Sequence, residues 1–404
     1  KDMIKKAKEI CNKVVLVVNS VNAIELGPVM NGEYECDAIL ITMNPGENGF
    51  ESMSDILCGE INPSGRTVDT YSRNFLLGPE MKNYGTFRYT DANYNNSART
   101  YMAYEEDIYV GYKFYETAHD IGATNYEYGE LDEEGGVITE GRVCYPFGYG
   151  LSYTDFTEKI VSYDDSGSMI NVGIEIKNTG DVAGKDVVEL YYKAPYTELD
   201  EEYDIEKATA NLIEYDKTKL LEPGEKETLH LSFLKEEMAS YCFTRDNGDD
   251  TFGCWMMEEG NYEISLRKNS HQITETRTFH QPSTVWYDAS NPRQMEKDKQ
   301  SILNDDGRVT NVPEKGEDAN WIAATNAIQK CSDFMMEEQT RLTRKNWDET
   351  VPVDTRTNSQ QVPTKPFDQE KWGSLWLDKS FNIATDEILG DIEGSKIYVA
   401  PEDM

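Results

Sequence analysis

Residues 44–71 of the chain, NPGENGFESMSDILCGEINPSGRTVDTY, decide the fold. An apolar run at residues 37–42 leads into this stretch, and it is short and bounded enough to predict a buried strand. Pro45 and Gly46 would end that strand, and Gly49 adds a second flexible point before the next element. The chain is therefore expected to turn tightly here, from a strand into a helix.

The second half of this stretch has the pattern of a short helix followed by a turn. Three apolar side chains recur at helical spacing, namely Met53, Ile56 and Leu57. Gly59 would end the helix, and the NPSG at residues 62–65 predicts a turn in which proline fixes φ and Gly65 supplies a positive φ. Together these signals predict a strand–loop–helix–turn unit of a layered α/β domain.

The residues before this unit extend the same alternation. Residues 2–12 predict a helix with one apolar face, and residues 14–18 predict a fully buried strand dominated by β-branched side chains. Helix, strand, loop, strand and helix in this order predict parallel strands with covering helices.

The order of these motifs resembles the second domain of family 3 glycoside hydrolases. In that family PGxxGG, an apolar helix ending in Gly, and NPSGR follow one another; here Phe50 replaces the second Gly of the first motif. Residues 65–71, GRTVDTY, resemble the variant seen in members with reversed domain order. Residues 104–116, YEEDIYVGYKFYE, are similar to the family's YxEGIYVGYRYYE, and residues 145–154, YPFGYGLSYT, match its motif without a gap.

From about Asp155 onward, apolar residues alternate with polar ones, which predicts β-strands. Polar turns separate these runs, at residues 178–181, 223–225 and 246–249. Period-two strands with polar turns predict an all-β sandwich of the immunoglobulin or fibronectin III type. Residues 177–184 and 221–225 also resemble the fibronectin type III-like domain that follows the α/β domain in this family.

We therefore expect three parts: an α/β domain at residues 1–158, a fibronectin type III-like sandwich at residues 159–282 and an irregular C-terminal extension at residues 283–404. The composition of the extension predicts a linker with weak order, with a helix expected at residues 319–334. Residues 340–350 resemble the LSRxDWxGT element, which in reversed-order members connects the sandwich to a (β/α)8 barrel. The resemblance implies that this chain stops before that barrel.

Charge and composition exclude several classes of function. The net charge of −36 over 404 residues argues against nucleic acid and anionic lipid as partners, because both would be repelled. No apolar run approaches the ~18 residues of a membrane span. The histidines form no HExxH set and no Gly-rich nucleotide motif follows a strand, so we expect neither a metal nor a cofactor.

The cysteines predict free thiols rather than disulfides. Their number, seven, is odd, and no two are spaced as CxxC. They are Cys11, Cys36, Cys58, Cys144, Cys242, Cys254 and Cys331. Buried free thiols in a reducing compartment are the better interpretation, and we therefore expect a cytoplasmic location. The sequence begins at Lys1 rather than Met, so its lack of a signal peptide does not bear on the native N-terminus.

The family resemblance implies a retaining glycosidase, which needs a nucleophile and an acid/base about 5 Å apart. In the family the nucleophile is an Asp of the barrel, and the acid/base is a Glu upstream of the helix that opens this chain. Both are thus expected outside this sequence, and we assign no catalytic residue. Glu47 is the candidate substrate contact, because it follows a strand at the edge where α/β domains bind ligands; a surface acid of the loop is the alternative.

Other conspicuous side chains have structural interpretations. Arg66 is expected to brace the domain by ion pairing, and Glu105 and Glu106, which precede a strand-like aromatic run, are expected to be structural or solvated. The aromatic side chains of the YPFGYGLSYT motif could stack on sugar rings, but packing between the two domains is the favoured interpretation. These side chains are Tyr145, Phe147, Tyr149 and Tyr153.

Together these inferences predict a portion of a retaining β-glycosidase of the β-glucosidase type. The complete enzyme would act on oligosaccharides or aryl β-glycosides, whereas this chain alone would be inactive because it lacks the barrel. The alternative is a non-catalytic carbohydrate-binding or structural module.

Overall fold

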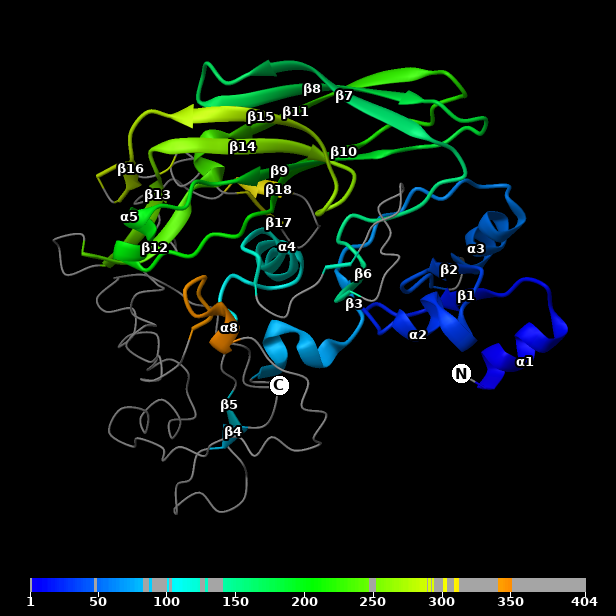
Figure 1. The fold of residues 1–404 in the computed structure, drawn as a ribbon. Helices are drawn as coiled ribbons and strands as arrows, with labels where there is room; N and C mark the ends of the chain where they lie inside the picture. The colour runs from blue at the N-terminus through cyan, green and yellow to red at the C-terminus, as the bar shows by residue number, and fades with distance from the viewer. Residues whose placement is uncertain are drawn as a thin grey trace.

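The computed structural model describes residues 2–46, 49–82, 87–88, 100–101, 104–123, 128–129, 141–246, 252–288, 290–291, 293, 301–303, 309–311 and 341–350. Within them an α/β domain precedes a β-sandwich, the fold class that the sequence predicts (Figure 1). Among these residues no helix has the length and apolar character needed to cross a membrane.

The α/β domain is built around two parallel strands. Its elements are α1 (Asp2–Ile10), β1 (Val15–Val18), α2 (Gly27–Met30), the 3-10 helix η1 (Gly32–Tyr34), β2 (Ala38–Ile41) and α3 (Gly49–Cys58). The parallel pairing, with Val15 opposite Ala38, is as predicted. The expectations of a fully buried strand at residues 14–18 and a buried strand at residues 37–42 are wrong: Val15 is 44% exposed, and no residue of β2 is buried. The two strands form a two-stranded sheet in the described chain, so few neighbours cover them.

Helix α3 ends as predicted, but the turn after it does not form. Gly59 has φ +79°, and the amide of Glu60 donates to the carbonyl of Asp55 at 2.8 Å, as in a glycine-terminated helix. Gly65 does not adopt the positive φ that the NPSG turn predicted. The reason lies in Asn62, whose amide donates to the carbonyl of Ala183 at 3.1 Å and thereby holds the segment against the sandwich.

A connecting region follows, in which 3-10 helices η2 (Phe75–Leu77) and η3 (Pro79–Lys82) lie between short strands. These strands are β3 (Tyr71–Ser72), which pairs with β6 (Val143–Tyr145), and β4 (Phe87–Arg88), which pairs with β5 (Thr100–Tyr101). The aromatic run after Glu106 is a helix, α4 (Tyr112–Asp120), and not strand-like as expected. Its buried face is contiguous because Phe114, Tyr115 and Ala118 recur at helical spacing.

The sandwich consists of two antiparallel sheets, as the period-two pattern predicts. One sheet has the order β10 (Asn211–Lys217), β9 (Val187–Lys193), β14 (Gly260–Arg267) and β15 (Ile273–Gln281); the other has the order β11 (Lys226–Leu234), β8 (Met169–Asn178) and β7 (Phe156–Asp164). Ile174, Leu190 and Ile264 are fully buried between the sheets. Burying each such side chain contributes about 1.5–3 kcal/mol.

Smaller elements complete the described chain. They are α5 (Glu198–Tyr203), η4 (Lys235–Met238), the sheet of β12 (Ser240–Asp246), β13 (Phe252–Met257) and β16 (Val285–Tyr287), the pair β17 (Ser301–Leu303) and β18 (Val309–Asn311), and α8 (Trp347–Thr350). The helix expected at residues 319–334 lies outside the described residues.

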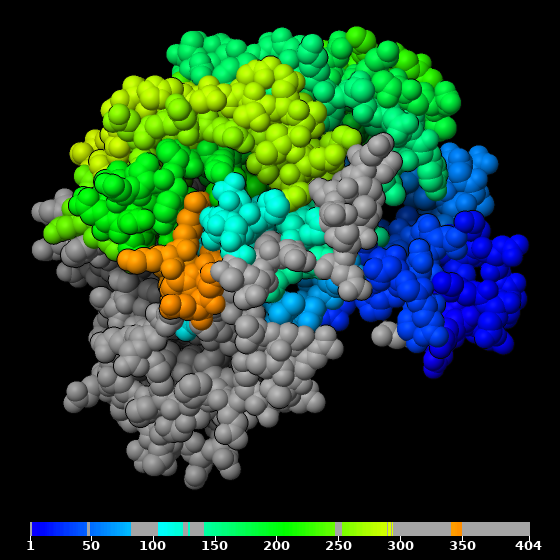
Figure 2. Space-filling view, in the orientation of Figure 1, coloured from blue at the N-terminus to red at the C-terminus, as the bar shows by residue number. Residues whose placement is uncertain are grey.

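Residues 341–350, which we call the strap, pack against both domains. The Trp347 ring is 3% exposed and stacks on Phe114 of α4, with 5.2 Å between ring centroids. The amide of Leu342 donates to the carbonyl of Glu105 at 2.6 Å. The strap, orange in Figure 2, lies against α4 in cyan and the green part of the sandwich. Within the extension these residues are thus packed through two buried apolar side chains, Leu342 and Trp347, although their composition is polar.

We expect Trp347→Ala to destabilise the folded chain by about 3–5 kcal/mol, since it removes a large buried aromatic side chain. Lys345→Ala, in the same segment but exposed, should change stability by less than about 0.5 kcal/mol. Urea unfolding of both variants measures the difference. Equal, small effects would mean that the strap does not pack as described.

Candidate functional site

The candidate substrate contact, Glu47, lies outside the described residues. The adjacent acids Glu105 and Glu106 are described, and they are structural, as expected. Glu105 accepts a strap amide through its backbone, and the Glu106 side chain is only 7% exposed. Burial raises the pKa of Glu106. Since Glu47 cannot be described, the candidate site described below is the junction where the two domains meet.

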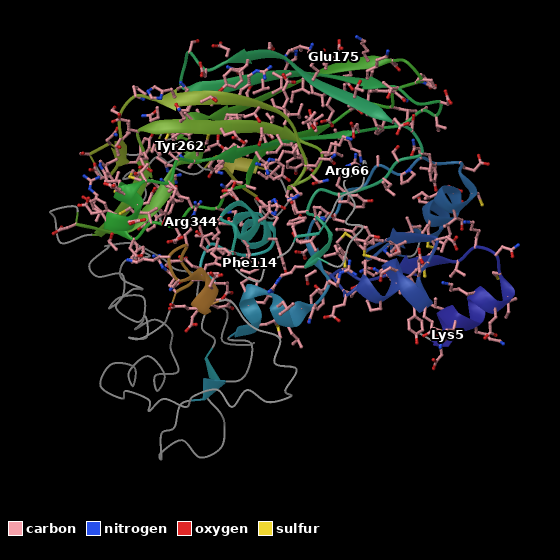
Figure 3. All side chains as sticks on the ribbon, in the orientation of Figure 1. Lys5, Arg66, Phe114, Glu175, Tyr262 and Arg344 are labelled. Carbon is pink, nitrogen blue, oxygen red and sulfur yellow. The ribbon has the colours of Figure 1, made fainter. Side chains whose placement is uncertain are left out.

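Arg66 forms the central ion pair of this junction. Its Nη2 donates to Oδ1 of Asp186 at 2.7 Å, and the two side chains are only 14% and 7% exposed. Figure 3 labels Arg66, which lies between the α/β domain and the sandwich. Arg66 directly follows the NPSG segment, whereas Asp186 directly precedes β9 of the sandwich. The bracing role predicted for Arg66 is confirmed, and the partner belongs to the other domain.

Arg66 lies in the field of more carboxyl groups than it can neutralise. Burial, and then the adjacent carboxyl of Asp186, raise the pKa of Glu158 well above its ordinary value. Burial also raises the pKa of Glu189 to about 7, although the Tyr191 hydroxyl, which donates to it at 2.7 Å, opposes the shift. The junction therefore retains protons at a pH where exposed glutamates have lost theirs.

The glycines of the YPFGYG loop let this junction close. Gly148 has φ +82°, and a side chain there would overlap the carboxyl group of Glu189. A side chain at Gly150 would overlap the carbonyl of Gly65. The loop is held by backbone bonds of 2.8 Å from Gly148 to Thr67, and from Thr67 to Tyr149. Glycine is thus required here for close approach as well as for conformation.

The aromatic side chains of the same motif pack on protein. Phe147 lies 4.7 Å from Tyr112 between ring centroids, and Tyr145 stacks on Tyr149 at 5.0 Å. The half-exposed Tyr153 donates its hydroxyl to the carbonyl of Ile56 at 2.9 Å. All of these contacts lie within residues 1–158, so these aromatic side chains pack inside the α/β domain rather than between the two domains.

A second connection between the domains centres on Glu116 of α4. Its carboxyl group accepts hydroxyl hydrogen bonds from Tyr128 and Ser270, both 2.9 Å long, and lies 2.7 Å from Nδ1 of His271. The His119 ring lies 4.7 Å from the His271 ring between centroids. Burial, and then the neighbouring His271, lower the pKa of His119. Sequence reasoning missed this cluster, because Ser270 and His271 lie more than 150 residues from Glu116.

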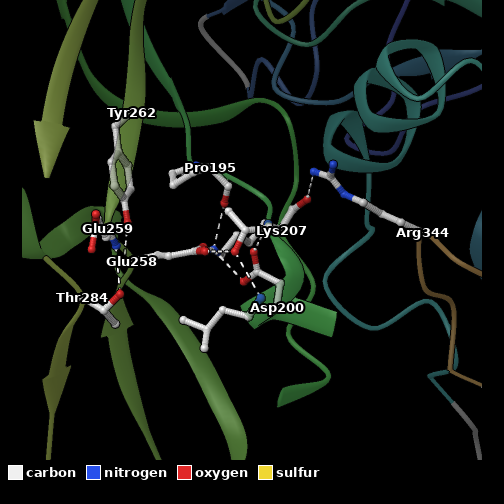
Figure 4. A network of polar contacts seen from close by, with 10 residues as sticks. Pro195, Asp200, Lys207, Glu258, Glu259, Tyr262, Thr284 and Arg344 are labelled. Atoms are coloured by element: carbon white, nitrogen blue, oxygen red, sulfur yellow. Dashed lines mark hydrogen bonds and ion pairs between the residues drawn. The ribbon is translucent and has the colours of Figure 1, made fainter. Parts of the chain in front are cut away.

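A third polar cluster lies within the sandwich region (Figure 4). The Lys207 ammonium group lies 2.6 Å from Asp200, donates to the carbonyl of Pro195 at 2.8 Å and pairs with Glu258. Burial raises the pKa of Asp200 to about 6, although Lys207 lowers it. Lys207 is 4% exposed and the two carboxylates are similarly buried, so the cluster holds the fold and presents no open site.

In the part of the chain that the structure describes, no group of three or more His, Cys, Asp or Glu side chains is arranged to hold a metal ion. The acidic clusters described above are buried in contacts between or within domains. A retaining glycosidase needs two carboxyl groups that face a sugar and water. These clusters instead provide rigid connections.

Comparison with known proteins gives two matching domains. Residues 1–112 match the glycosyl hydrolase family 3 C-terminal domain, and residues 186–270 match the fibronectin type III-like domain. Over 285 residues the chain is 29% identical to the β-glucosidase of Ruminococcus albus, a match that covers 70% of this chain and 25% of that protein. It is 30% identical over 281 residues to β-glucosidase A of Butyrivibrio fibrisolvens, covering 66% and 29%.

A solved structure shows the same similarity. β-Glucosidase 3B from Thermotoga neapolitana, in complex with α-D-glucose, aligns with a TM-score of 0.53 at 30% identity, covering 71% of this chain and 34% of that one. The chain therefore spans between about a quarter and a third of the length of these relatives.

We expect Gly148→Ala to destabilise the chain more than Gly224→Ala. Both glycines have nearly the same positive φ, +82° and +81°, but nothing lies within 4 Å of a side chain at Gly224. Gly224→Ala should cost about 1–2 kcal/mol for its backbone conformation. Gly148→Ala should add about 1–3 kcal/mol from the overlap with Glu189. Denaturant unfolding measures both, and equal losses would contradict the close approach.

We expect Glu189→Gln to flatten the dependence of stability on pH. The folded state holds the Glu189 proton up to about pH 7, whereas an ordinary glutamate loses it near pH 4.5. This contribution is fully present below pH 4.5 and is lost as the pH rises through 7, by about 3 kcal/mol in total. Urea unfolding from pH 4.5 to pH 8 measures it. The variant Glu222→Gln, at an exposed site, should keep the native dependence of the unfolding free energy on pH. If Glu189→Gln left that dependence unchanged, the raised pKa assigned to Glu189 would be refuted.

Proposed function

This chain carries the C-terminal domain of glycosyl hydrolase family 3 joined to a fibronectin type III-like domain, and we propose that it forms part of a retaining β-glucosidase. The observation that carries the proposal is the similarity to β-glucosidases over 281–285 residues. The likeness to the glucose-bound Thermotoga neapolitana enzyme supports it. The complete enzyme would hydrolyse oligosaccharides or aryl β-glycosides.

In this proposal the chain provides a rigid wall of the substrate cleft, not the reacting carboxylates. The Arg66–Asp186 pair and the Glu116–His271 contact set the orientation of the α/β domain on the sandwich. The nucleophile and the acid/base would belong to residues outside this chain, the nucleophile to a barrel domain. The burial of Glu158 and Glu189 supports this division, because a glycosidic bond cannot reach them.

Two finer assignments belong to the same proposal. Glu47 would contact the sugar beyond the cleaved bond, since it follows β2 at the edge where α/β domains bind ligands. The location would be cytoplasmic, which the free thiols of the described cysteines support. Neither nucleic acid nor a membrane surface is proposed as a partner, because the net charge is −36.

The proposal predicts that the purified 404-residue chain releases no nitrophenol from aryl β-glucosides. A chimera should restore activity: the matched segment of this chain replaces the corresponding 285 residues of the Ruminococcus albus β-glucosidase. Hydrolysis is followed by absorbance, and folding of the chimera by its thermal transition. In the active chimera, Arg66→Gln should lower activity because it loosens the junction, whereas Glu222→Gln should not.

Other outcomes separate the alternatives. A folded chimera without activity, or turnover by the carefully purified chain alone, would contradict the proposal. Binding of oligosaccharides to the chain alone, measured by calorimetry and without hydrolysis, would favour a non-catalytic carbohydrate-binding module.

A further inference from the structure

Two cysteines face each other in the small sheet beside α5. Cys242 of β12 and Cys254 of β13 are direct partners in the antiparallel register, with Tyr241 opposite Trp255 next to them. Directly opposed residues of an antiparallel pair point to the same face of the sheet. Both cysteines are fully buried, and both are free thiols in this structure.

The spacing of such a pair suits a covalent bond. Opposed Cα atoms of antiparallel strands lie about 4.5 or 5.5 Å apart, depending on the hydrogen-bonding position. A disulfide needs Cα atoms between about 4.4 and 6.8 Å apart, so the bond requires little movement of the backbone. Cys144, the other buried thiol of the described chain, differs: its strand β6 pairs with β3, which contains only Tyr71 and Ser72.

A cationic side chain lies beside one sulfur of the pair. Nη1 of Arg245 donates to Sγ of Cys254 at 3.5 Å, and a guanidinium group beside sulfur stabilises the thiolate, which is the reactive form. In the closed fold burial dominates and raises the pKa of Cys254 to about 11. β12 is an edge strand of its sheet, so partial opening at this edge can admit a small disulfide without unfolding the sandwich.

We propose that Cys242 and Cys254 form a reversible disulfide that locks β12 to β13. The oxidant is a low-molecular-weight disulfide of the glutathione class. One cysteine thiolate attacks it and forms a mixed disulfide, releasing one small thiolate; the second cysteine thiolate then displaces the other. Two cysteine thiols lose two electrons and two protons, and the small disulfide is reduced to two thiols.

The locked strand would also hold the strap. The Phe243 ring of β12 lies 4.7 Å from the guanidinium group of Arg341 in the strap, and Thr244 donates to the carbonyl of Tyr203 at 2.6 Å. A disulfide at Cys242 would lie directly beside Phe243, the residue that contacts the strap. Oxidation should therefore reduce local unfolding of the strap, residues 341–350, as well as of β12 and β13.

The test refolds the full chain in a buffer of reduced and oxidised glutathione, because the unfolded chain exposes every thiol. After alkylation, a non-reducing digest is mapped by mass spectrometry. We expect one cross-linked peptide pair containing Cys242 and Cys254, and a melting temperature about 5 °C higher than that of the reduced chain. Dithiothreitol should reverse both changes.

Matched variants make the outcome decisive. Cys144→Ser should keep the cross-link and the thermal shift, whereas Cys254→Ser and Cys242→Ala should each abolish them. If one of these variants fails to fold, the peptide map of the unmodified chain still decides. Alkylation of both Cys242 and Cys254, in a buffer where the exposed Cys11 and Cys58 carry glutathione, would overturn the proposal.

Discussion

The ion pair between Arg66 and Asp186 is the interaction on which the arrangement of the two domains depends. It joins the end of the NPSG segment to the start of a central sandwich strand, and both side chains are largely buried. A buried pair contributes little net stability, but removing one partner leaves an unpaired charge in a poorly solvated place. The pair therefore selects one relative orientation of the domains more than it strengthens the fold.

The additional carboxyl groups around this pair change the protonation of the junction. The carboxyl groups of Glu158 and Glu189 remain near the single guanidinium group, and burial keeps them protonated well above their ordinary range. The glycine at position 148 is part of the same arrangement, because it leaves room for the Glu189 carboxyl. Arg66 after the NPSG segment, Gly148 of the YPFGYG loop and Glu189 of β9 thus belong to one packed junction. Packing at this junction explains these residues better than contact with a sugar does.

The sequence was sufficient for the fold class, the parallel pair, the sandwich and the role of Arg66. It was insufficient where tertiary contact decided the outcome. The NPSG turn failed because Asn62 binds the neighbouring domain, and the aromatic run before Glu116 is helical because one face of it meets the strap. The Glu116 and Lys207 clusters bring together groups distant in the chain, and periodicity carries no information about such pairings. Glu47 lies outside the described residues and stays a prediction.

The strap also fixes the position of the chain at residues 347–350. Because Trp347 stacks on Phe114, the chain at residues 347–350 is held at a fixed point beside α4. A group linked at a fixed point through a short connection has a much higher effective concentration at its binding site than one on a long linker. The Trp347 indole therefore determines from which point on the molecule the chain continues beyond residue 350.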